Sequence, residues 1–146
     1  MISDADVQQF VYGETVRSGR PPRAQEVANA LGSAPGVVLD AFRRLRERKL
    51  LALAAESGEI TMAPPFSAIP TLFQVRTSAQ SYFGNCVWDA FGIPAALHQD
   101  AWIDASCACC GDPMNLQVRE GRPEPAKGVA HFAVPAAHWW NDITYT

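Results

Sequence analysis

Apolar side chains recur at helical spacing in three stretches of the first fifty residues. The first stretch begins at Ser3, which with Asp6 three residues later is typical of a capped helix start, and it ends near Gly19. The second stretch ends at Gly32, and the third opens at Pro35. Each predicted helix has one apolar stripe, and the three stripes are Val7, Phe10 and Val11, then Val27, Ala28 and Leu31, then Val38, Phe42 and Leu45.

A shorter pattern follows the third helix. Leu50–Leu53 and Glu59–Met62 flank Ala55–Gly58, which predicts a β-hairpin. Three helices followed by a hairpin are typical of a winged helix-turn-helix domain. Ala63–Pro65 then breaks the pattern, because two prolines do not both fit inside a central strand or a helix. We therefore expect a winged-helix-like domain over residues 1–63.

Residues 64–146 have the pattern of a mixed α/β domain, so the expected fold class of the whole chain is α+β. A helix is predicted around Cys86, and Gly121–Pro123 is predicted as a turn between two strands. The predicted strands are Phe66–Ile69, Thr71–Val75, Ala101–Asp104, Met114–Val118 and Gly128–Val134.

Cys86 and Asp89 are the first candidates for chemistry. If Asn85 caps the predicted helix, Cys86 lies in its first turn, where free backbone N–H groups favour a thiolate. Asp89, three residues later, would share that helix face and could hold or deliver a proton. The alternative is a buried cysteine packed as a small apolar residue, with an aspartate on the helix surface.

Composition narrows the class of protein. The chain has 146 residues, 18% of them charged, and a formal net charge of −3, so no overall field attracts a polyanion. No apolar run is long enough to span a membrane, and the first residues lack the basic start of a signal peptide. Three of the four cysteines lie within residues 107–110, unlike a secreted disulfide framework. We expect a cytoplasmic protein without a membrane partner.

The third helix favours one alternative, a winged-helix DNA-binding or metal-responsive regulator. Its end is rich in basic residues, but residues 1–50 hold eight Lys or Arg against six Asp or Glu, a surplus of only two. The basic residues also lie at the helix C-terminus, where they interact favourably with the helix dipole. They are Arg43, Arg44, Arg46, Arg48 and Lys49.

Cys107 and Cys110 are candidate ligands for a soft metal. One Cys-x-x-Cys pair supplies half of a tetrahedral zinc site, and none of the three histidines has a ligand spacing to it, which argues against structural zinc. A thioredoxin-like redox motif fits poorly, because Gly111–Pro113 predicts a turn rather than a helix start. The remaining alternative is a turn between strands with incidental thiols. The histidines are His98, His131 and His138.

The segment Cys86–Pro94 resembles the first active-site motif of the organomercurial (alkylmercury) lyases, Cys-x-x-Asp-x-x-x-x-Pro in an aromatic-rich context. Weaker resemblances follow at Ala105–Pro113, Val129–Pro135 and His138–Thr146, so the similarity extends over nearly the whole chain. The family combines an N-terminal winged-helix-like region with a distinctive α/β domain. Its members cleave carbon–mercury bonds by protonolysis.

The resemblance implies a role for each motif residue. Cys86 would bind mercury and Asp89 would carry the proton, with a small organomercurial as substrate and Hg(II) as bound product. No cofactor is implied; an external thiol would accept the Hg(II), and a mercuric reductase is a possible partner. Four aromatic residues would line an apolar pocket for the organic group, although core packing explains them equally well: Tyr82, Phe83, Trp88 and Phe91.

One departure from the family concerns its second active-site cysteine, which the resemblance places just beyond Thr146. The sequence is then expected to be either part of a longer protein or a homologue without that thiol. Cys107, Cys109 or Cys110 could replace it. A non-catalytic mercury- or thiol-binding homologue is the third alternative.

Overall fold

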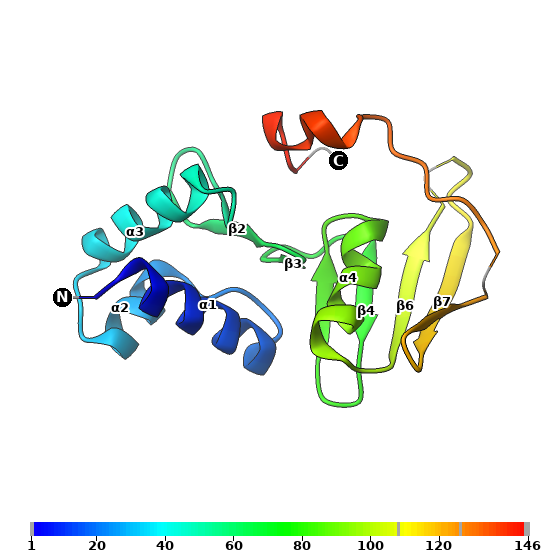
Figure 1. Cartoon of the computed structure of the whole chain (residues 1–146), viewed down its shortest axis with the longest axis horizontal. Helices are drawn as coiled ribbons and strands as arrows, with labels where there is room; N and C mark the ends of the chain where they lie inside the picture. Colours follow the sequence, from blue (N-terminus) through cyan, green and yellow to red (C-terminus); the bar gives the residue numbers. More distant parts are fainter. Residues whose placement is uncertain (1, 108, 126, 145–146) are drawn as a thin grey trace. The chain divides into compact units, whose positions relative to one another are not determined.

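A computed structural model describes residues 2–107, 109–125 and 127–144. Contacts between residues divide the chain into two compact units, residues 1–69 and 70–146 (Figure 1). The first unit extends beyond residue 63, where the sequence predicts a boundary, because the short strand after the two prolines pairs with the strand before them.

The first unit consists of three helices followed by a small antiparallel sheet. The helices are α1 (Asp4–Ser18), α2 (Ala24–Leu31) and α3 (Pro35–Glu47), and the sheet has the order β1 (Ala52–Leu53), β2 (Ile60–Ala63), β3 (Phe66–Ser67). The predicted helix signals are confirmed: Ser3 and Asp6 form a capping box, and Gly19 and Gly32 end α1 and α2 in the left-handed conformation.

The core of the first unit is formed by the stripes that the sequence predicts. Val7, Val27 and Phe42 are completely buried, one from each helix, and Leu51 and Ile60 cover them from the sheet side. A helix presents one face to its neighbours, so residues three and four apart are buried together. Apolar burial on this scale accounts for the packing of three short helices that would not be stable alone.

The second unit is a five-stranded antiparallel sheet with one helix, α4, packed on it (Figure 1). Its strands follow the order β5-β4-β6-β7-β8, and a short 3-10 helix, η1, comes near the end of the chain. The bounds are β4 (Phe73–Arg76), β5 (Ser81–Gly84), α4 (Val87–Leu97), β6 (Ala101–Ser106), β7 (Pro113–Arg119), β8 (Arg122–Glu124) and η1 (Ala136–Asn141). The prediction of a mixed α+β fold is confirmed.

Two of the strands predicted for residues 64–146 differ from the structure. Gly128–Val134 forms no strand; β7 pairs instead with β8, with Gln117 opposite Glu124. The reason is the turn at Glu120 and Gly121, where both residues have positive φ (49° and 74°), so the chain reverses at once and pairing resumes at Arg122. The predicted strand at Phe66–Ile69 is limited to β3 and belongs to the sheet of the first unit.

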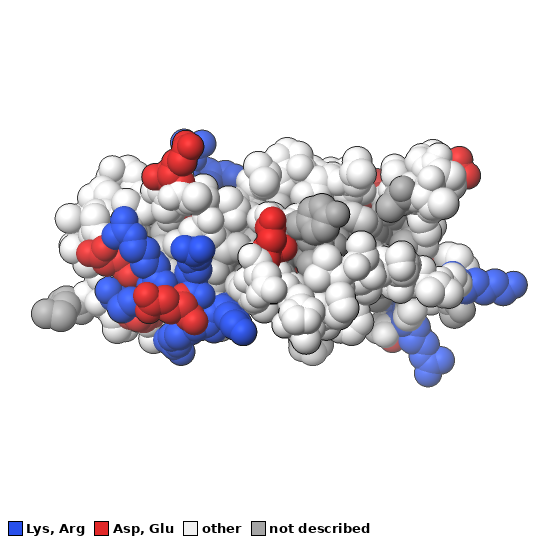
Figure 2. Space-filling view, turned by 90° about the horizontal axis from the view of Figure 1, so that it is seen from above, with Lys and Arg blue, Asp and Glu red and all other residues white. Residues whose placement is uncertain are grey.

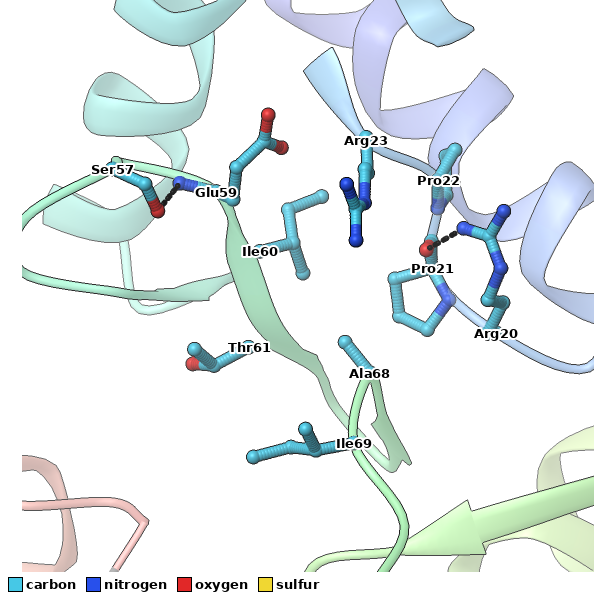
Figure 3. A pocket seen from close by; sticks show the side chains of 10 residues that line it. All are labelled: Arg20, Pro21, Pro22, Arg23, Ser57, Glu59, Ile60, Thr61, Ala68 and Ile69. Carbon is cyan, nitrogen blue, oxygen red and sulfur yellow. Dashed lines mark hydrogen bonds between the residues drawn. The ribbon is translucent and has the colours of Figure 1, made fainter. Parts of the chain in front are cut away.

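A pocket of about 520 Å³ lies within the first unit, between residues 20–23 and β2 (Figure 3). Two of its charged side chains have partners: Arg20 donates to Glu26, and Glu59 accepts from the backbone N–H of Ala24 at 2.9 Å. The pocket has no thiol among its lining residues. The cysteines all belong to the second unit.

Over the residues that the structure describes, no helix combines the length and the apolar character needed to cross a bilayer.

Candidate active site

Cys86 stands at the junction between β5 and α4. It is the N-cap residue of α4, with extended backbone angles (φ −143°, ψ −179°), and the helix begins at Val87. The prediction that Asn85 caps the helix is therefore wrong. The side-chain amide of Asn85 instead donates to the backbone carbonyl of Ile143 at 3.0 Å, which ties the end of the described chain to this junction.

Gly84 allows β5 and α4 to approach closely. A Cβ at this position would lie 2.8 Å from the backbone nitrogen of Ala90 and 3.2 Å from the carbonyl carbon of Asp89. Both atoms belong to the first turns of α4, so a methyl group here has no room without moving the helix. The glycine thus sets the position of the turn that carries Asp89.

We expect Gly84→Ala to lower the free energy of unfolding of the second unit by about 1–3 kcal/mol, as for other overpacked sites. The measurement is urea unfolding followed by tryptophan fluorescence, because all four tryptophans lie in that unit. Gly13→Ala is the matched control, since a Cβ at Gly13 in α1 meets no atom within 4 Å. An unchanged midpoint for Gly84→Ala would contradict the close approach. The tryptophans are Trp88, Trp102, Trp139 and Trp140.

The two candidate residues lie together in the interior. The Sγ of Cys86 donates to Oδ2 of Asp89 across 3.5 Å, and the two residues are 9% and 7% exposed. Asp89 is the one buried carboxylate in the described part of the chain. The alternative of an aspartate on the helix surface is therefore wrong. A thiol and a carboxylate in contact can share a single proton.

Burial changes the acidity of both groups. It raises the pKa of the Cys86 thiol, and the negative charge of Asp89 raises it further. The N–H groups of Asp89 and Trp88 act in the opposite direction without forming a cap hydrogen bond, and burial outweighs them. Burial also raises the pKa of Asp89, against the effect of its bond with the Cys86 thiol. The structure thus acts against the predicted thiolate at a helix start, because burial raises the pKa of both members of the pair.

The structure separates the four aromatic residues predicted to line one pocket. Tyr82 and Phe83 are neighbours on β5, so their side chains point to opposite faces of the sheet, and Tyr82 is a core residue at 2% exposure. Phe91 lines a cavity of about 300 Å³ together with Pro123, Pro125 and residues 127–130. Trp88, 65% exposed, lines a different cavity.

The cavity beside Trp88 brings together residues that the sequence analysis did not assign to a pocket with Trp88. It measures about 610 Å³, and residues 130–136 and Trp139 form the rest of its lining. Phe132 and Trp139 pack with ring centroids 5.0 Å apart, and Nε1 of Trp139 donates to the carbonyl of Val134 at 2.7 Å. Residues 130–134 alternate like a strand in the sequence but form none, and Trp139 lies in η1, so the sequence pattern does not mark them as one lining.

The other three cysteines lie on the turn between β6 and β7. Cys107 is half-buried, whereas Cys109 and Cys110 are exposed. The backbone N–H groups of Cys110 and Cys109 and the thiol of Cys110 lower the pKa of Cys107. Within the described ranges, no three His, Cys, Asp or Glu side chains come together in a way that could hold a metal ion.

These positions change the expected order of alkylation. The sequence alone predicts that Cys86 reacts first, but its thiol is buried and its pKa is raised. Thiolate content and access decide the rate, so we expect Cys107 to be labelled first by iodoacetamide near neutral pH and Cys86 last. Peptide mass mapping after limited labelling measures the order. Early labelling of Cys86 would show that its thiol is more open than in this structure.

Comparison with known proteins covers both the sequence and the fold. Residues 66–146, more than half of the chain, match the MerB (alkylmercury lyase) family. The chain is similar in fold to the protein in the crystal structure of the mercury-bound form of MerB2, with a TM-score of 0.61 and 23% sequence identity. That similarity covers 83% of this chain and spans 61% of the other. Among curated protein sequences, none matches the chain.

Proposed function

Since the chain belongs to the alkylmercury lyase family, as the motif at residues 86–94 predicts, we propose that it cleaves the carbon–mercury bond of small organomercurials by protonolysis. Cys86 is the mercury-binding thiol and Asp89 is the proton carrier. The observation that carries this proposal is the buried contact of 3.5 Å between the Cys86 thiol and the Asp89 carboxylate. A soft thiolate suits mercury, and a protonated carboxyl group beside it suits proton delivery.

The reaction requires one proton, which the pair itself supplies. As the sulphur of Cys86 forms a bond to mercury, its proton passes to the carboxylate of Asp89. The carboxyl group then gives that proton to the carbon atom, and the electron pair of the carbon–mercury bond forms the new carbon–hydrogen bond. The hydrocarbon leaves, Hg(II) stays on the sulphur, and Asp89 is a carboxylate again. Burial supports this role, because the raised pKa of Asp89 makes its carboxylate a better acceptor for the thiol proton.

Turnover then requires a thiol acceptor for Hg(II). We propose that an external low-molecular-weight thiol or a protein thiol, such as that of a mercuric reductase, removes the metal, and that no further cofactor takes part. A cytoplasmic location fits this requirement, because reduced thiols are abundant there.

The direct test is headspace detection of benzene from phenylmercuric acetate, with the protein in buffer containing excess thiol. Release that is proportional to protein concentration and above the rate of thiol alone is expected. Absence of release, with the mercury compound bound to the protein in its intact mass spectrum, would favour the non-catalytic mercury-binding homologue.

For the first unit, we propose a winged-helix-like fold with a structural role. Three helices followed by the hairpin of β1 and β2 support the fold. Two arginines of the basic cluster on α3 already have carboxylate partners, Arg43 with Asp40 and Arg44 with Asp4. Figure 2 shows positive and negative side chains mixed on the visible face of this unit. The visible face has no continuous basic stripe of the kind that attracts nucleic acid, which makes the regulator the weaker candidate.

A further inference from the structure

The turn between β6 and β7 is folded so that two cysteines meet. Ser106 pairs with Pro113 at the base of the turn. Above this pair, the N–H of Cys107 donates to the carbonyl of Asp112 at 2.9 Å, and the N–H of Gly111 donates to the carbonyl of Cys107 at 2.8 Å. Cys107 takes part in both hydrogen bonds, so Gly111 and Asp112 are folded back toward it.

The side chains follow the backbone of this turn. The thiols of Cys107 and Cys110 lie close enough to interact, three residues apart on this turn, and their interaction lowers the pKa of Cys107 and raises that of Cys110. Both thiols are free, Cys110 is exposed and Cys107 is half-buried, so an ion from solution has access to the pair. Cys109 is exposed on the same turn.

We propose that Cys107 and Cys110 form a second metal site, separate from the Cys86 and Asp89 pair, which takes a soft cation in two-coordinate thiolate geometry, with Hg(II) as the best-suited ion. Two adjacent thiols provide two sulphur ligands. The described residues contribute no cluster of three or more metal ligands, which excludes a tetrahedral zinc site built from them. Thiolates favour soft cations, and Hg(II) is stably bound by two sulphur atoms.

Binding at this site is a ligand exchange that needs no redox partner. Two sulphur–mercury bonds form, and the two thiol protons pass to buffer. The second thiol of the pair acts at a high effective concentration, of order millimolar or above, so the pair should hold mercury against a competing monothiol that strips a single cysteine. The site does not depend on whether the chain cleaves organomercurials.

The test uses the full chain with Cys86→Ser, which leaves only the thiols of the turn. After one equivalent of HgCl₂, excess glutathione and gel filtration, we expect about one mercury per chain by elemental analysis, in accord with a two-thiol site. Adding Cys107→Ser or Cys110→Ser should lower retention roughly tenfold or more, since one thiol then competes alone. Adding Cys109→Ser, the matched control on the same turn, should leave retention unchanged.

The other outcomes overturn the proposal. A loss with Cys109→Ser as large as with the other two changes would show that the site needs all three thiols, and full retention in every variant would show that no particular pair of thiols is required. Mercury-linked dimers in the intact mass spectrum would show that the two sulphur ligands come from different chains. Far-UV circular dichroism of each variant separates loss of binding from loss of fold.

Discussion

Replacement of Cys86 by serine is expected to lower hydrocarbon release by roughly a thousandfold or more, the scale seen when a nucleophile is removed. Serine keeps the size of the side chain but replaces a soft sulphur with a hard oxygen that binds mercury poorly. Of the four cysteines, Cys86 is the one in contact with the buried carboxylate of Asp89. The measurement is the rate of benzene release from phenylmercuric acetate in excess thiol.

Cys109→Ser is the matched control for this prediction, because it makes the same change at an exposed thiol. It should leave the release rate within about twofold, as expected for a surface side chain outside the reacting groups. If Cys86→Ser continues to release benzene while the additional removal of Cys107 stops it, the reacting thiol lies on the turn between β6 and β7. The proposed mechanism would then be wrong.

Replacement of Asp89 by asparagine is expected to separate mercury capture from bond cleavage. The amide keeps the shape of the side chain and can still accept from the Cys86 thiol, but it has no proton to give. Capture of phenylmercury, measured by intact mass, should be retained, whereas benzene release should fall by about 100-fold or more, in the range of general acid catalysis. This is the pattern of a group that acts in the transition state.

The pH dependence gives an independent check on Asp89. The reaction uses the proton of the Cys86 thiol, and burial together with the negative charge of Asp89 raises the pKa of that thiol. Release should therefore decline as the pH rises through the raised pKa of Cys86, and Asp89→Asn should move this decline to lower pH, because the amide carries no negative charge. Asp104→Asn is the control, because Asp104 is a half-exposed residue of β6 paired with Arg76. Loss of capture together with release in Asp89→Asn would indicate a structural role instead.

Local signals in the sequence are sufficient for the three helices of the first unit. The capping box at Ser3 and Asp6 and the stop at Gly19 depend only on residues a few positions apart, and the structure has both. The stripe positions of α1 to α3 are buried as the helical period requires. Local chemistry of this kind acts before any long-range contact forms, which is why it can be read without a structure.

In the second unit, local signals do not predict strand pairing or the direction of side chains. The alternating residues 128–134 have a strand pattern. Because the chain turns tightly at Glu120 and Gly121, however, it is β8 that pairs with β7. The aromatic residues around Cys86 lie close together in the sequence. Strand alternation and packing nevertheless place their side chains in the core or in different cavities. Pairing partners and the direction of a side chain depend on the other strands and helices around it.

The sequence by itself determined the α+β character of the chain, its three N-terminal helices, its family and the spacing that brings Cys86 and Asp89 to one helix turn. Only the tertiary structure decided that Cys86 caps the helix, that both groups are buried and that their pKa values rise. The physical reason is that spacing along a helix is a local property, whereas solvation of a thiol and a carboxylate depends on all the atoms that exclude water from them. Burial raises the pKa of both groups, against the thiolate that the sequence alone predicts at Cys86.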